Sequence, residues 1–344
     1  MKRRSVSVLL IIFVAVGIIA AWELFGPIVK SPSRKYLYIP TNASYKQVKD
    51  SLIQNKIIAG TWWFDKVSGY LNYNTNTAIK PGKYRIEDGM SVVRLVRMLR
   101  AGSQAAVKLV ITKLRTKEEL SKKIGDNFEC DSTAFINFLN NNDSALKYHL
   151  DTNNVMTAVI PNTYTFTWNN TPARIFRKLY GEQQIFWTTI RKNKAASLHL
   201  STTEVYILAS IVEEETNKDD DKGRIASVYL NRMHQGMKLA ADPTVKFAMR
   251  DFGLKRILFK HLTFNSIYNT YQNPGLPPGP ISTPSIKTID AVLNMPSTDY
   301  LYFVAKSDFS GYSNFSSGYA EHMKNAKTYQ QALDSVIRLK QQSN

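Results

Sequence analysis

Residues 207–216 read ILASIVEEET, an apolar run that ends in Glu213, Glu214 and Glu215. Apolar residues recur at helical spacing through residues 203–216, so the sequence predicts an amphipathic helix here. At 100° per residue, Glu215 falls inside the apolar stripe, whereas Glu213 and Glu214 fall outside it. We therefore expect Glu215 to face the protein and the other two glutamates to face solvent.

The acidic cluster has three alternative roles. A frayed helix end would leave all three glutamates hydrated. A metal site shared with Asp219, Asp220 and Asp221 is the second alternative, although the spacing matches no calcium-loop motif. The run KDDDKG at 218–223 reads more simply as a solvated turn that starts the next helix. In the third alternative, desolvation and like-charged neighbours raise the pKa of Glu215, as a general acid requires.

The segment after the cluster predicts a second helix, GRIASVYLNRMHQG at 223–236, which buries Ile225, Val228 and Tyr229. Asp242 follows, with Pro243 next to it. The favoured role of Asp242 is to cap a helix that has Pro243 at its first position. The rival role is a second carboxylate beside Glu215.

A loop-rich segment, YNTYQNPGLPPGPISTPS, covers residues 268–285. A loop of this length is usually functional or disordered, and its prolines favour a functional one. Its aromatic and amide side chains suit sugar binding. Residues 300–306 and 311–316 predict a hairpin, and residues 320–341 an amphipathic helix.

The N-terminal residues MKRR precede an uncharged stretch from Ser5 to Trp22. This predicts a transmembrane helix over residues 5–25, with residues 1–4 in the cytoplasm and the body outside it. A cleaved signal peptide is the alternative. The anchor is favoured, because no small-x-small cleavage site precedes Glu23.

The 344 residues suffice for two domains, and the 44% hydrophobic content excludes wholesale disorder. The net charge of +18 favours an anionic partner. We expect no nucleic acid, because the body lies outside the cytoplasm and no zinc-finger spacing or Lys/Arg run occurs. The single cysteine, Cys130, can form no internal disulfide.

Residues 36–105 predict a compact α/β module. Tyr36 and Tyr38 suit a strand that precedes a helix, and residues 79–102 repeat the arrangement after a turn at Pro81 and Gly82. Ser91 suits the N-cap of the second helix, and Gly102 its end.

Three segments, 207–216, SVYLNRMHQGMKLAADPTV at 227–245 and 268–285, occur in this order before YLYFVAKSD and SNFS. Together they resemble the YceG-like family of endolytic murein transglycosylases. The resemblance implies an α+β chain: a transmembrane helix, a LysM-like subdomain at 36–105 and a larger mixed α/β catalytic domain at 107–340.

The resemblance also implies the activity. The family is a group of carbon–oxygen lyases that cleave the β-1,4 bond between MurNAc and GlcNAc within peptidoglycan strands. Cleavage uses no water and leaves a 1,6-anhydro-MurNAc end, which would terminate strand elongation. The family's Glu-x-Glu-Thr motif matches Glu213 to Thr216 and makes Glu215 the single general acid/base. At position 214 related sequences often have lysine; here Glu214 should raise the pKa of Glu215 further.

Motif membership suggests five substrate-binding residues: Asn231, Asp242, Tyr268, Asn269 and Tyr271. The expected partners are glycan strands, the cell membrane (the inner membrane) through the N-terminal helix, and the wall-synthesis machinery; no cofactor or metal is expected. Two rivals remain: a hydrolase that uses Glu215 and Asp242, and an anchored glycan-binding scaffold without activity.

Overall fold

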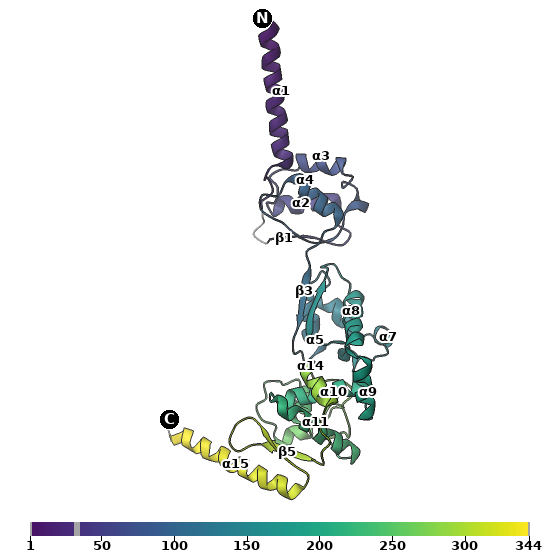
Figure 1. Cartoon of the computed structure of the whole chain (residues 1–344), viewed down its shortest axis with the longest axis vertical. Coiled ribbons are helices and arrows are strands. Elements are labelled where there is room, and N and C mark those ends of the chain that lie inside the picture. The colour runs from purple at the N-terminus through teal and green to yellow at the C-terminus, as the bar shows by residue number, and fades with distance from the viewer. Residues whose placement is uncertain (1, 31–34, 343–344) are drawn as a thin grey trace. The chain divides into compact units, whose positions relative to one another are not determined.

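The structure, a computed structural model, describes residues 2–30 and 35–342 (Figure 1). The chain divides into two compact units. The first unit contains Met1–Leu109, Gly125–Asp131 and Thr165–Thr171, and the second contains Val110–Ile124, Ser132–Tyr164 and Pro172–Asn344.

The first helix, α1, spans Lys2–Phe25. Its segment Val6–Phe25 has a mean hydropathy of 2.7, and none of it is buried within the structure. Among the described residues, no other single helix is long and apolar enough to cross a membrane. A signal sequence can have the same length and composition. A helix is therefore present where the sequence predicts one, over Lys2–Phe25 rather than 5–25.

The described part of residues 26–105 has two strands, three α-helices and a 3-10 helix around one core. Strands β1 and β2 pair antiparallel, with Tyr36 opposite Arg85. The predicted ends of the helix Val92–Ala101 are confirmed. Ser91 accepts a hydrogen bond from the Arg94 amide at its N-cap, and Gly102, with a φ of 71°, ends it. The element α3 was not predicted. The elements are β1 (Tyr36–Ile39), α2 (Tyr45–Gln54), α3 (Trp62–Tyr70), η1 (Asn76–Ala78), β2 (Gly82–Arg85) and α4 (Val92–Ala101).

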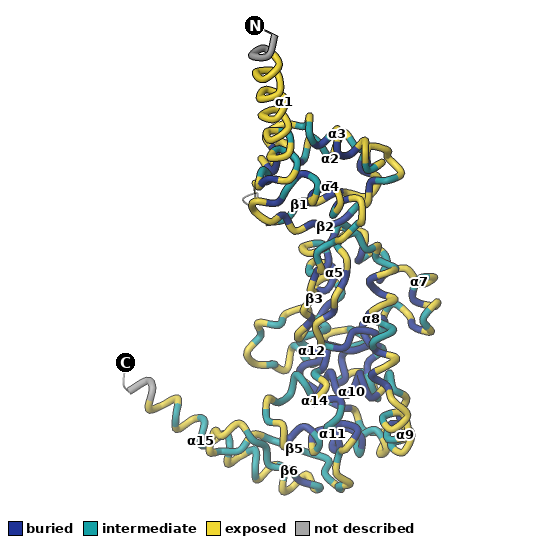
Figure 2. Tube along the Cα trace, turned by 45° about the horizontal axis from the view of Figure 1, so that its top comes forward, coloured by how far each residue is buried: buried dark blue, intermediate teal, exposed yellow. Residues whose placement is uncertain are grey.

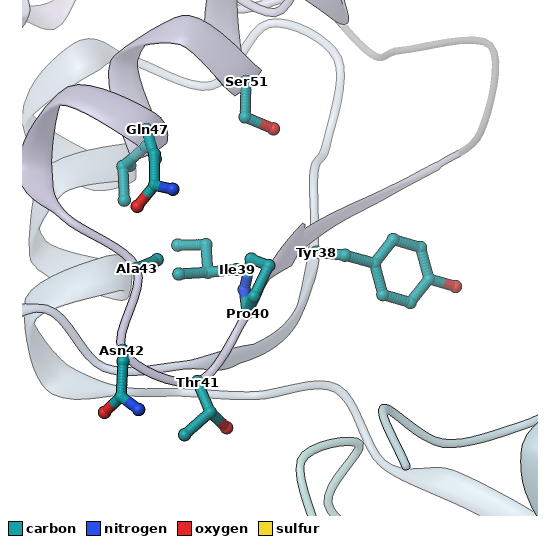
Figure 3. Close-up of a pocket in the computed structure, with 9 residues that line it drawn as sticks. Tyr38, Ile39, Pro40, Thr41, Asn42, Ala43, Gln47 and Ser51 are labelled. Atoms are coloured by element: carbon teal, nitrogen blue, oxygen red, sulfur yellow. The ribbon is translucent and has the colours of Figure 1, made fainter. Parts of the chain in front are cut away.

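A pocket of about 260 Å³ lies between the end of β1 and α2. Gln47 and Ser51 line it from α2, and Thr41 and Asn42 line it from the connecting turn (Figure 3). The Tyr38 ring points away from these side chains and packs edge-on against Trp168 at 5.1 Å.

Strand β3 (Val107–Ile111) pairs with β4 (Asn162–Phe166), and the division between the units runs through both strands. The strands β5 (Tyr302–Ala305) and β6 (Ser313–Ser316) form the predicted antiparallel hairpin. The helices that follow β3 are α5 (Lys117–Gly125), α6 (Ser132–Leu139), α7 (Asn142–Leu146), η2 (Val155–Ala158), α8 (Pro172–Phe186), α9 (Thr189–Ser197), α10 (Thr202–Glu215), α11 (Asp219–His234), α12 (Asp242–Met249), α13 (Phe259–Leu262), α14 (Ile286–Leu293) and α15 (Tyr319–Gln342).

Helix α10 lies at the centre of the second unit. A capping box between Ser201 and Glu204 starts it, and every residue from Val205 to Val212 is buried (Figure 2). Helices α11 and α14 pack against it. The helix is therefore buried on all sides, and the prediction of an amphipathic helix with a solvent face is wrong.

The segment 268–285 forms no helix or strand, yet much of it is buried against α10. The Ile281 amide donates to Ser210 Oγ at 3.0 Å, and the Ser282 hydroxyl donates to the Ser210 carbonyl at 3.2 Å. Gly279 allows a close approach, because a Cβ there would lie 2.0 Å from the Asn153 carbonyl oxygen. The loop is thus a fixed layer beside the helix that carries the three glutamates.

Candidate active site

Glu215 is the last residue of α10, and its side chain is half-buried. The Tyr229 hydroxyl donates a 2.6 Å hydrogen bond to Glu215 Oε1. Tyr229 is buried on α11 and packs edge-on against Phe303 of β5. Because Tyr229 occupies Oε1, the second oxygen, Oε2, is the one available to a ligand.

Burial raises the pKa of Glu215 to about 7, from an ordinary value of 4.5. The hydrogen bond from Tyr229 opposes this rise, the charge of Asp242 adds to it, and the charges of Lys246 and Arg232 oppose it. Near neutral pH the carboxyl group therefore exchanges a proton readily, as general acid/base catalysis requires.

Asp242 does not cap α12. The N-cap is Ala241, so Asp242 is the first residue of the helix and not its cap. It accepts a 2.6 Å hydrogen bond from the Tyr271 hydroxyl. Burial raises the pKa of Tyr271, and the bond to Asp242 adds to the rise, so this hydroxyl stays protonated. The structure thus contradicts the favoured capping role and places Asp242 where its charge acts on Glu215.

Glu214 is not a solvent-facing acid, contrary to the prediction. Its side chain is 13% exposed and forms ion pairs with Lys113 at 2.8 Å and Arg115 at 3.0 Å. These two cations compensate its charge, so the carboxylate that raises the pKa of Glu215 is Asp242. The expectation that Glu214 would raise it is not supported.

Glu213 is also held by the protein, again contrary to the prediction. Its Oε2 atom accepts hydrogen bonds from the Ser285 amide at 3.3 Å, from the Ser285 hydroxyl at 3.0 Å and from the Thr288 hydroxyl. Ser285 is the N-cap of α14. Glu213 therefore fastens the end of α10 to the start of α14.

The run 218–223 starts α11, as we predicted, but it is only partly solvated, with Asp219 and Asp220 exposed. Asp221 is fully buried and accepts a 2.7 Å hydrogen bond from the Ser313 amide of β6. Lys222 is buried too and pairs with Asp219 at 2.9 Å. Asp219 also pairs with Lys287 at 2.8 Å. Asp219 and Asp221 lie in the first turn of α11 and connect it to α14 and β6, respectively.

The other predicted residues lie apart from these carboxylate contacts. Asn231 donates to the carbonyls of Thr298 and Tyr300 at 2.9 and 3.0 Å. Asn269 is fully buried and donates to the carbonyls of Leu262 and Phe264. The side-chain amide of Asn231 thus holds the loop before β5, and that of Asn269 holds the loop after α13. The Tyr268 ring packs against Phe247 of α12 at 4.8 Å between centroids.

Residues 37–328 match the model of the YceG-like family, which is most of the chain. The chain belongs to the YceG-like family. A curated relative, the endolytic murein transglycosylase of Bacillus subtilis, is 28% identical over 328 residues, covering 89% of this chain and 88% of the relative. The endolytic murein transglycosylase of Streptococcus pneumoniae is 24% identical; the match covers 79% of this chain and 55% of that relative.

A crystal structure of a yceG-like protein from Listeria monocytogenes has the same fold. It superposes with a TM-score of 0.55 at 26% identity and covers 85% of this chain and 99% of its own. The mixed α/β architecture with an apolar N-terminal helix is thus that of a YceG-like protein.

In this YceG-like chain, sequence reasoning missed Tyr229, Arg232 and Lys246 as site residues. Tyr229 was predicted to be buried, but nothing local indicates that its hydroxyl reaches a residue 14 positions earlier. Lys246 also lines a small pocket of about 60 Å³ with Arg115 and Phe247. The signal that could have found these residues is their position inside or directly after the motif segment 227–245.

Proposed function

We propose that this chain is a peptidoglycan lytic endotransglycosylase that cleaves the MurNAc-β-1,4-GlcNAc bond within glycan strands. Glu215 would act as the single general acid/base and leave a 1,6-anhydro-MurNAc end. The observation that carries the proposal is a half-buried carboxyl group with a pKa of about 7, hydrogen-bonded on one oxygen by Tyr229. The names of the two curated relatives support the same activity.

In the first step, protonated Glu215 donates its proton from Oε2 to the glycosidic oxygen, and the bond from MurNAc C1 to that oxygen breaks. The bond from Tyr229 to Oε1 then stabilises the carboxylate that forms. The charges of Lys246 and Arg232 favour the same state.

In the second step, the Glu215 carboxylate takes the proton of the C6 hydroxyl of MurNAc as that oxygen bonds to C1. The attacking group belongs to the substrate, so proximity replaces a bound water molecule. The net reaction is an elimination of the GlcNAc-terminated strand, and Glu215 ends protonated, ready for another cycle.

Asp242 and Tyr271 are the proposed sugar contacts nearest to the acid. Asp242 is exposed, and Tyr271 is partly exposed and hydrogen-bonded to it, so the pair offers one acceptor and one oriented hydroxyl. We propose that Tyr268 extends this surface. Asn231 and Asn269 would act through the loops that they hold.

We also propose a membrane topology and domain bounds for the chain. Residues 1–4 would be cytoplasmic, residues 5–25 would span the cell membrane once, and the remainder would lie outside the cytoplasm. Residues 36–105 would be a LysM-like subdomain and residues 107–340 the catalytic domain. Cleavage of nascent strands would end their elongation, with the wall-synthesis machinery as a partner.

Mass spectrometry of peptidoglycan digested by the wild type, Glu215→Gln and Glu204→Gln tests the proposal. Glu204 is a matched control, because it lies on the same helix and glutamine also suits its capping position. We expect 1,6-anhydro ends from the wild type and the control and no cleavage by Glu215→Gln. Reducing ends would indicate the hydrolase instead, and cleavage by Glu215→Gln would refute the site.

A further inference from the structure

An apolar pocket of about 320 Å³ lies where α1 meets the rest of the first unit. Leu24 and Phe25 line it from the end of α1, Trp63 and Tyr70 from α3, and Val93 from α4. Figure 1 shows α3 and α4 beside this end of α1. The apolar helix α1 thus ends at an apolar hollow.

The rim of this pocket exposes aromatic rings. Tyr70 is 88% exposed, and Trp62, next to the pocket residue Trp63, is 59% exposed. Trp22 and Phe25 of α1 are also more than half exposed. Tyrosine and tryptophan concentrate at membrane–water interfaces, where a ring can lie among headgroups.

Basic residues surround the same hollow. Lys66 and Arg97 line the apolar pocket. Arg97 also lines a neighbouring polar pocket of about 580 Å³, together with Lys80 and Arg100. Among the described residues that line the two pockets, none is acidic. Cations beside aromatic rings match the anionic headgroup of a phospholipid above its acyl chains.

We propose that the face formed by α3, α4 and the end of α1 docks on the anionic lipid headgroups of the bilayer that α1 spans. This inference rests on the proposed membrane anchor. Phospholipid phosphates would contact Lys66, Lys80, Arg97 and Arg100, and the rings of Trp62 and Tyr70 would enter the headgroup layer. The first unit would then lie against the membrane rather than move freely at the end of α1.

The test uses the full chain in lipid nanodiscs. Cys130→Ser removes the natural cysteine, and an environment-sensitive fluorophore is attached to one new cysteine. Tyr70→Cys reports on docking, Phe13→Cys, within α1, on insertion of the anchor, and Arg85→Cys, exposed on β2, is the control site. Discs contain phosphatidylglycerol or only phosphatidylcholine.

In phosphatidylglycerol discs we expect blue-shifted emission and quenching by brominated lipid at the Tyr70 and Phe13 sites and neither at the Arg85 site. In phosphatidylcholine discs only the Phe13 site should show the full blue shift and the full quenching by brominated lipid. Arg97→Gln with Arg100→Gln should lower the docked-to-undocked ratio on the order of 30-fold, at about 5-fold for each charge.

A matched pair of charge removals elsewhere in the unit, Lys46→Gln with Arg85→Gln, should change the ratio little. A water-exposed Tyr70 site in anionic discs, with the Phe13 site inserted, would overturn the docking proposal and leave the anchor standing. A water-exposed Phe13 site would overturn both. Equal docking on both lipids would overturn the role of the cations.

Discussion

Replacing Glu215 by glutamine should stabilise the protein at alkaline pH although it removes the proposed catalytic group. The native pKa of about 7 exceeds the ordinary 4.5, so the folded state binds this proton more tightly than the unfolded state. The contribution of the group to stability is therefore fully present below pH 4.5 and is lost as pH rises through 7. At 1.36 kcal/mol per pKa unit, the loss is about 3 kcal/mol at pH 8 and less than about 1 kcal/mol at pH 5.

Glutamine carries no charge at either pH, and its side-chain oxygen can still accept the bond from Tyr229. The gain of Glu215→Gln over the wild type should therefore be about 3 kcal/mol at pH 8 and shrink to under about 1 kcal/mol at pH 5. For a unit of this size that corresponds to roughly 6–12 °C in Tm at pH 8.

Hydrogen exchange of the α10 amides at both pH values measures the relevant free energy of opening, since these amides lie in the core of the second unit. Glu204→Gln controls for the loss of a charge on the same helix and should not reproduce the gain. A Glu215→Gln variant that is less stable than the wild type at pH 8, or whose gain is equal at pH 5 and pH 8, would refute the reasoning about burial.

Three further substitutions probe the same network. Tyr229→Phe removes the donor to Oε1, so the pKa of Glu215 should rise and the alkaline limb of the rate–pH profile should move up by about one to two units with a lower maximal rate. Asp242→Asn removes a charge that raises the same pKa, so that limb should move to lower pH; an unchanged profile would contradict the coupling. Glu213→Ala removes the carboxylate that accepts from the Ser285 amide and from the Ser285 and Thr288 hydroxyls, so the free energy of unfolding should fall by about 2 kcal/mol, measured as a lower urea midpoint.

Local signals predicted the two ends of α4 and the inward direction of the Glu215 side chain. The cap at Ser91 and the stop at Gly102 depend on residues close in sequence, so the sequence alone located them. Helical spacing placed Glu215 toward the protein, where burial raises its pKa.

Long-range contacts explain what the sequence missed. Glu214 looked solvated, but its partner Arg115 lies 99 residues away. Glu213 looked solvated as well, but Ser285 lies 72 residues away. Helical spacing assigns a face of a helix to solvent only by assuming that nothing covers it. Here segments that lie far before and far after α10 in the sequence cover it, and no pattern within α10 itself indicates them.

Two hydrogen bonds between Thr283 and Leu114 affect when the second unit can fold during synthesis. The Thr283 amide donates to the Leu114 carbonyl across 169 residues at 2.7 Å, and the Leu114 amide donates back to the Thr283 hydroxyl at 2.8 Å. At roughly 5–20 residues per second, the ribosome needs about 10–30 s to make the intervening chain. Until then the segment after β3 lacks its partner, and α10 lacks the layer that closes over Ser210. The second unit should therefore acquire protease resistance late and in one step, after residue 285 has emerged.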